Sequence, residues 1–113
     1  MEKIVEQGLL YDFYGELLTE HQKQIYEAAV YNDMSLTEIA DEHGISKQGV
    51  HDLIKRCTKT LQGYEDKLHM IRRFEAIKAQ AEELKRASDK DLDASALKKV
   101  VLDISDNILE ELT

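Results

Sequence analysis

The chain has 113 residues, with 15 basic and 23 acidic side chains and a formal net charge of -8. It contains no proline, no tryptophan and one cysteine, and 42% of its residues are hydrophobic. This hydrophobic content is too high for a disordered chain, and the length suits one folded domain spanning residues 1–113. The acidic excess argues against nucleic acid or an anionic membrane as a partner for most of the surface.

The sequence carries no sign of export. A single cysteine cannot form an intramolecular disulfide, which favours a reducing compartment. The first residues are charged where a signal peptide needs an apolar region, and no apolar run approaches the ~18 residues of a membrane span. We therefore expect a cytoplasmic protein that does not insert into membranes.

Apolar residues recur at helical spacing almost throughout, without the alternation typical of strands, so the chain is predicted to be all-α. A first helix is expected over residues 1–18. Thr19 with Gln22, and Ser35 with Glu38, fit capping boxes that begin a second helix, ending near residue 30, and a third, short helix. Asn32 and Asp33 interrupt the pattern between them.

A fourth helix is expected to begin at Ser46, which can cap its free N–H groups. Residues 61–87 carry apolar side chains three or four apart, which predicts a long amphipathic helix, either separate from the fourth or continuous with it. Asp93 is the expected cap of a final helix whose apolar residues run from Leu97 to Leu112. Residues 18–60 are thus predicted to form a compact core, and residues 61–113 two long helices.

The apolar faces of the two long helices exceed what a three-helix unit can cover. Pairing with a second copy would bury them, so we expect a homodimer whose recognition helices meet half-sites about one DNA turn (~34 Å) apart. The alternative is intramolecular: the first helix could pack with the two long ones.

Residues 36–55 fit a helix-turn-helix unit, in which two short helices cross steeply around a tight turn. A small residue is needed at the crossing and a residue that tolerates positive φ in the turn, and Ala40 and Gly44 occupy these places. His43 departs from the pattern, since that position is usually apolar. The predicted structural residues of the motif are Ile39, Ala40, Gly44, Ile45, Val50 and Leu53. The alternative is an ordinary hairpin of two helices.

The start of the fourth helix is locally basic, with four basic residues and one acidic residue between Gly44 and Thr60. Spacings of three and four place several polar side chains on the side opposite the apolar one, where a groove of DNA would lie. The predicted DNA-contacting residues are Ser46, Lys47, Gln48, His51, Lys55, Arg56 and Lys59. The alternative is a solvated helix face. Few phosphates would be neutralised, so binding should be weak and salt-dependent.

Two resemblances rest on these motifs. The segments Leu18-Thr19-Glu20-His21-Gln22, Ser35-Leu36-Thr37-Glu38-Ile39-Ala40 and Gly44-Ile45-Ser46-Lys47-Gln48-Gly49-Val50 resemble region 4 of bacterial sigma factors, which implies a three-helix DNA-binding fold without a wing. The whole chain resembles the YlxM-type family of small helix-turn-helix proteins, through Asp12-Phe13-Tyr14-Gly15-Glu16-Leu17-Leu18-Thr19 and Tyr64-Glu65-Asp66-Lys67-Leu68 as well.

The YlxM-type resemblance implies a regulatory role in the signal recognition particle pathway, with components of that particle as partners beside double-stranded DNA. An alternative function is an adaptor that binds these protein or ribonucleoprotein components and does not read DNA. Lys47 stands where the family tends to have Arg, which weakens guanine reading, because Lys offers only a point charge. Gly49 stands where a helix former is common, and close packing or a tolerated weakness of the helix is favoured over close approach to a DNA backbone.

No motif for catalysis is visible, so an enzyme is not expected, and neither is a cofactor. The acidic segment 89–93 opens like a calcium loop but lacks the required glycine and glutamate. The histidines show no metal-ligand spacing. Cys57 is expected to be a small core residue.

Overall fold

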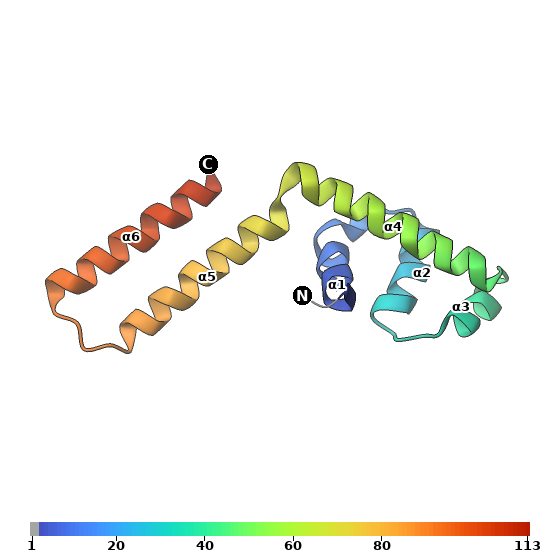
Figure 1. The fold of residues 1–113 in the computed structure, drawn as a ribbon, viewed down its shortest axis with the longest axis horizontal. Coiled ribbons are helices and arrows are strands. Elements are labelled where there is room, and N and C mark those ends of the chain that lie inside the picture. Colours follow the sequence, from blue (N-terminus) through green and yellow to red (C-terminus); the bar gives the residue numbers. More distant parts are fainter. Residues whose placement is uncertain (1–2) are drawn as a thin grey trace. The chain divides into compact units, whose positions relative to one another are not determined.

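A computed structural model describes residues 3–113, which form α-helices and one short 3₁₀ turn, without a β-strand in that range (Figure 1). The all-α prediction is confirmed. The chain divides into two compact units, one ending at His69 and the other running from Met70 to Thr113.

The first unit contains α1 (Lys3–Tyr14), the 3₁₀ turn η1 (Gly15–Leu17), α2 (Glu20–Val30), α3 (Leu36–His43) and α4 (Lys47–Leu68). Helix α4 is the longest of these and packs against α1, α2 and α3. The predicted first helix is found between Lys3 and Leu17, with its last turn tightened to 3₁₀; residues 1 and 2 lie outside the described residues.

Both predicted capping boxes are present. The backbone N–H of Gln22 donates to Oγ1 of Thr19 over 3.2 Å, and the Thr19 N–H donates to Oε1 of Gln22 over 2.9 Å. Ser35 and Glu38 make the same reciprocal pair at 3.1 and 3.2 Å. Each box satisfies two N–H groups that a helix start leaves free, so α2 and α3 begin where local chemistry dictates.

The core of the first unit forms where α4 crosses the other helices. Its largest fully buried side chains are Ile25, Tyr26, Ile39, Val50, Cys57 and Leu61. Burying one aliphatic side chain of this size contributes roughly 1.5–3 kcal/mol. Because three of the six residues lie on α4, this helix organises the packing of the unit.

The second unit is a hairpin of two antiparallel helices, α5 (Met70–Ser88) and α6 (Ala94–Leu112) (Figure 1). Asp93 caps α6 as predicted, accepting from the N–H of Ala96 over 2.7 Å. The buried residues of the two helices are Ala87 and Ile104. A helix pair buries one side of each helix only, so the hairpin leaves much apolar surface exposed.

The predicted helix over residues 61–87 is wrong in its limits. Helix α4 continues without a break from Lys47 through Leu61 to Leu68, and α5 starts afresh at Met70. Between them His69 takes a left-handed conformation at φ 57°, and its N–H donates to the carbonyl of Glu65 over 2.8 Å. The apolar spacing runs across this break, and neither glycine nor proline marks it, so periodicity alone gave no signal.

The break also moves the expected internal boundary. A division at residues 60 and 61 would cut through the middle of α4, whereas the chain divides into its two compact units between His69 and Met70. The grouping of residues 1–113 into one domain stays a prediction.

Candidate nucleic-acid interface

The turn between α3 and α4 has the geometry of a helix-turn-helix unit. Gly44 adopts a left-handed conformation at φ 67°, and its N–H donates to the carbonyl of Ala40. The N–H of Ile45 donates to the same carbonyl over 3.1 Å. Ser46 then caps α4, accepting from the N–H of Gly49 over 2.9 Å. These bonds end one helix and begin the next within three residues, which fixes the sharp change of direction.

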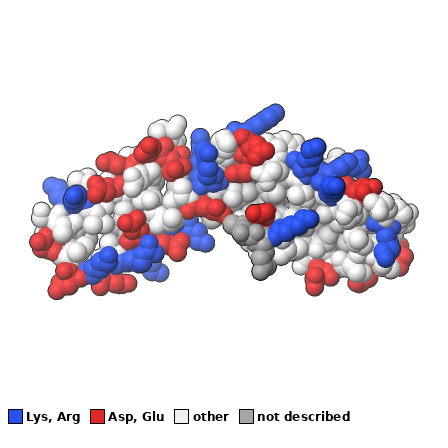
Figure 2. Space-filling view, viewed as in Figure 1, with Lys and Arg blue, Asp and Glu red and all other residues white. Residues whose placement is uncertain are grey.

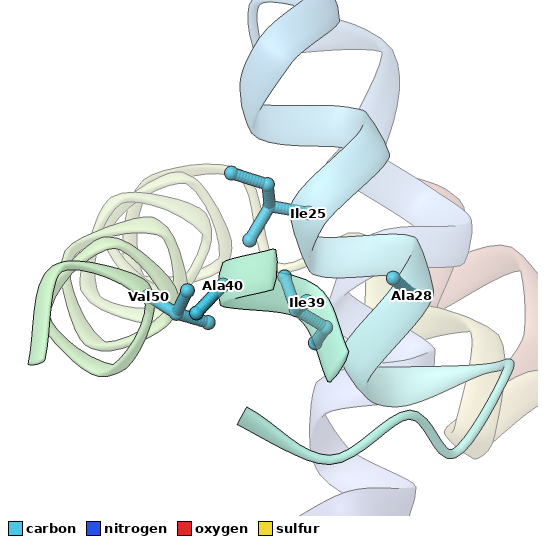
Figure 3. Close-up of a cluster of buried hydrophobic side chains, with 5 residues drawn as sticks. All are labelled: Ile25, Ala28, Ile39, Ala40 and Val50. Atoms are coloured by element: carbon cyan, nitrogen blue, oxygen red, sulfur yellow. The ribbon is translucent and has the colours of Figure 1, made fainter. Parts of the chain in front are cut away.

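The predicted structural residues of the motif meet in one apolar cluster. Ile39 and Ala40 of α3 and Val50 of α4 are buried there with Ile25 and Ala28 of α2 (Figure 3). Ile45 and Leu53 are partly buried and pack against this cluster. Because α2 contributes to the cluster, α2, α3 and α4 form a three-helix unit. The packing of these helices fixes the orientation of α4 and therefore of its exposed side.

His43, the residue that departs from the usual pattern, is half-buried beside another histidine. Its ring lies 6.1 Å from that of His21, at an interplanar angle of 76°. An edge-to-face pair of this kind provides packing area that an apolar side chain would otherwise supply. The unusual histidine at position 43 is therefore packed against a side chain of α2.

Gly49 lies beside the helix cap. A Cβ atom added there would come 3.0 Å from Oγ of Ser46, tighter than most real Cβ contacts. This supports close packing as the reason for glycine at this position, since the hydroxyl that caps α4 occupies the space.

The predicted DNA-contacting side chains on the early turns of α4 are all exposed, together with the capping residue before them: Ser46, Lys47, Gln48, His51, Lys55, Arg56 and Lys59. Figure 2 shows basic side chains gathered over the part of the surface that α4 occupies, with acidic side chains among them. The exposed basic side chains and the buried apolar ones lie on different sides of one amphipathic helix.

Asp52 lies within this basic surface. Its Oδ1 accepts from Nε2 of Gln48 over 2.9 Å and lies 3.6 Å from Nδ1 of His51. The Asp52 carboxylate thus accepts from an N–H of Gln48 that could otherwise donate to a base edge or a phosphate. Gln48 must break this hydrogen bond before it can contact DNA, which lowers its net contribution to the free energy of binding.

Four of the seven residues line two different hollows of the surface. His51, Lys55 and Lys59 line a groove between α1 and α4 with a volume of about 760 Å³. Arg56 lines a separate hollow of about 450 Å³ on α4, together with residues at the start of α2 such as Thr19 and His21. The structure brings Lys55 and Lys59 together with His51 at one groove, while Arg56 lines a different hollow.

Residues of α1 at this groove were missed by sequence reasoning. Lys3 and Gln7 line it opposite the α4 side chains. Gln7 is 9% exposed, and its Nε2 donates to Oγ1 of Thr58 over 3.3 Å. A pair separated by 51 positions leaves no mark in local spacing, so no sequence signal could have joined α1 to this surface.

Thr58 holds α1, α2 and α4 together through one hydroxyl. Its O–H donates to the carbonyl of Ile54 over 2.9 Å. A hydroxyl carries one hydrogen and two lone pairs, so Thr58 must accept from both Gln7 and Tyr26, whose oxygen lies 2.9 Å away. All three bonding positions of the hydroxyl are therefore used inside the protein.

The described residues contain no group of three or more His, Cys, Asp or Glu side chains placed to hold a metal. Cys57 is 1% exposed, and burial raises the pKa of its thiol, opposed by the nearby charge of Arg56. Its packing agrees with the predicted core position. None of the helices in residues 3–113 is long and apolar enough to cross a membrane.

Comparison with known proteins gives one consistent match. The model of a protein family described as "Putative helix-turn-helix protein, YlxM / p13 like" matches residues 1–101. A UPF0122 protein of Symbiobacterium thermophilum is 40% identical over 101 residues, which are 89% of this chain and 94% of that protein.

Further relatives carry the same family name. A UPF0122 protein of Shouchella clausii is 36% identical over 101 residues, or 89% of this chain and 93% of its own length. One from Thermoanaerobacter pseudethanolicus is 44% identical over 78 residues, or 69% of this chain and 67% of its own. The similarity therefore includes the helix-turn-helix unit and most of the hairpin.

Proposed function

The chain belongs to the family of helix-turn-helix proteins described as YlxM / p13 like, and from this premise we propose that it binds double-stranded DNA as a regulatory protein. The observation that carries the proposal is the exposed basic side of α4 directly after a well-formed helix-turn-helix turn. Lys47, His51 and Lys55 face the groove of DNA, and Lys59 and Arg56 lie near phosphates. Gln48 and Ser46 supply uncharged contacts.

Electrostatics predicts weak contact through one small face. The net charge of -8 repels DNA elsewhere on the surface, and Asp52 lies inside the basic region. Each phosphate that a lysine neutralises adds about 0.9 to the slope of log affinity against log salt for duplex DNA. A few such contacts give binding that is measurable at low salt and lost at high salt.

The test is fluorescence anisotropy of the full chain with duplex DNA over a range of salt concentrations. Replacing Lys47 and Lys55 by Ala should weaken binding, and replacing Arg56 and Lys59 by Ala should also flatten the salt slope by about 2, roughly 0.9 for each lost phosphate contact. Lys67→Ala is the matched control, an exposed lysine of α4 that lines neither hollow. Two results would rule out the proposal: no duplex binding at low salt, or a loss of affinity in Lys67→Ala as large as that caused by replacing Lys47 and Lys55.

The hairpin of α5 and α6 supports the homodimer. Large apolar side chains with exposed fractions of 39% to 62% lie along this hairpin, among them Leu84, Val101, Leu102, Leu109 and Leu112. The charges of the two helices are complementary: α5 carries five basic and three acidic residues, and α6 two basic and four acidic. A second copy that places its α6 against α5 would bury apolar surface and pair opposite charges, giving a four-helix bundle.

Light scattering on the full chain tests the dimer. Leu102→Glu with Leu109→Glu should halve the mass, because each substitution puts a charge into the buried interface. Lys99→Glu, on the same helix but outside this apolar set, should leave the mass unchanged. A monomeric mass for the unchanged protein at micromolar concentration contradicts the dimer.

A second candidate function is the adaptor of the signal recognition particle pathway, in the cytoplasm, where both DNA and the particle are accessible. The acidic balance of the chain favours it, because protein partners do not require a basic surface. A pull-down with the purified protein and RNA components of the particle tests it. Retention of either component by a variant lacking Lys47 and Lys55 would favour the adaptor over DNA reading.

A further inference from the structure

The groove between α1 and α4 has the size and lining of a small-molecule site. Its volume of about 760 Å³ lies within the range of ligand pockets, roughly 300–1,000 Å³. Leu36 and Ile54, which are partly buried and pack against the apolar core, form its floor, and polar and charged side chains of α1 and α4 line the rest. Such a floor accepts a flat ring, and the walls select its substituents.

The walls of the groove are basic in an acidic protein. Lys55 and Lys59 are four residues apart on α4, and Lys3 faces them from α1. Asp66, two turns beyond Lys59, is the acidic side chain among the lining residues. Cations that converge from two helices match an anion with several oxygen atoms better than a single carboxylate.

Gln7 supplies uncharged polar atoms at the same place. One N–H of its amide is bonded to Thr58, whose hydroxyl has no further capacity. Gln7 is 9% exposed, and its side-chain carbonyl accepts no hydrogen bond from residues 3–113 yet is not sealed from solvent. A side-chain amide held in this way offers an acceptor, and a remaining N–H, to the edge of a ring.

We propose that this groove binds a nucleoside phosphate. The base lies on Leu36 and Ile54 with its edge toward Gln7, and the phosphates contact Lys55, Lys59 and Lys3. Nucleotide binding itself is independent of the proposed function. Its regulatory consequence rests on that function: Lys55 and Lys59 belong to the proposed DNA-contacting set, so the bound nucleotide competes with DNA.

Isothermal titration of the full chain with ATP, adenosine and inorganic tripolyphosphate, at low salt without divalent cations, tests the site. ATP should bind more tightly than either part of the molecule. Lys59→Gln and Gln7→Leu should each weaken ATP about tenfold, as one lost hydrogen bond involving a charged or buried group does. Lys67→Gln should have no effect, and circular dichroism confirms that each variant is folded.

Three results would overturn the proposal: no ATP binding, tripolyphosphate binding as tightly as ATP, or equal effects of Lys59→Gln and Lys67→Gln. Competition is measured separately, by adding ATP to a complex with fluorescent duplex. Displacement supports regulation through shared lysines, and a ternary complex contradicts it. If the protein binds ATP but not DNA, the nucleotide site is supported and the proposed DNA-binding function is refuted.

Discussion

The hydroxyl of Tyr26 donates a hydrogen bond to that of Thr58, 2.9 Å away, and so fastens α2 to α4 in the interior of the first unit. The same Thr58 oxygen accepts from Gln7 of α1. One side chain therefore joins three helices, and it lies one turn beyond the proposed DNA-contacting residue Lys55. The orientation of α4 depends on this hydroxyl as well as on apolar packing.

Thr58→Val should destabilise the first unit. The replacement keeps the shape but leaves the Tyr26 hydroxyl and the Gln7 amide without their shared acceptor, at a cost of about 1–3 kcal/mol. Urea denaturation followed by circular dichroism measures the change. Thr58→Ser retains the hydroxyl and should cost clearly less. Equal losses for the two variants would mean that the bonds contribute nothing beyond packing.

Gly44→Ala should destabilise the helix-turn-helix unit by roughly 1–2 kcal/mol, because a side chain is strained at φ 67°. The added Cβ would meet no atom within 4 Å, so conformation alone is tested. Gly63→Ala is the control, since it also has open space but lies inside α4, where Ala is favoured by about 1 kcal/mol. Thermal denaturation should move the two variants in opposite directions, and a shared direction would contradict the argument.

Substitutions at Ser46 should separate capping from DNA contact. Ser46→Ala removes the acceptor for the Gly49 N–H and should cost about 1 kcal/mol of stability. Ser46→Asp keeps a good cap but places a negative charge on the proposed DNA face. The Asp variant should therefore stay stable and lose duplex affinity in anisotropy measurements. Unchanged affinity of the Ser46→Asp variant for duplex DNA would show that Ser46 does not lie in the interface.

The first unit should lose stability in alkaline solution. Burial raises the pKa of Tyr11 and of Tyr31 from 10.0 to about 12, assisted by hydrogen bonds to Glu27 and Asp12 respectively. A raised folded-state pKa means that the folded protein holds these protons more tightly. The stabilisation is complete below pH 10 and falls as the pH rises toward 12.

Urea denaturation at several pH values between 10 and 12 measures this loss, within the window set by the two pKa values. The variant with Tyr11→Phe and Tyr31→Phe should be less stable at neutral pH and less sensitive to alkali. A pH dependence as steep as that of the unchanged protein would place the titrating groups elsewhere.

Local chemistry was enough to predict the helix-turn-helix unit. Capping boxes at Thr19 and Ser35, the left-handed turn at Gly44 and the cap at Ser46 are each decided by neighbours within four residues. The exposed side of α4 followed from helical periodicity. The break at His69 was missed, because the apolar spacing continues across it and neither glycine nor proline marks the left-handed residue.

The sequence by itself determined the helical class, the caps and the basic side of α4, because these depend on contacts between residues close together in the chain. Only the tertiary structure decided which cations share a groove. It placed Lys3 and Gln7 beside Lys55 and Lys59, and directed Arg56 to a different hollow. The angle at which α1 crosses α4 is fixed by packing and by the bonds at Thr58 between residues far apart in the chain, which spacing along the sequence does not record.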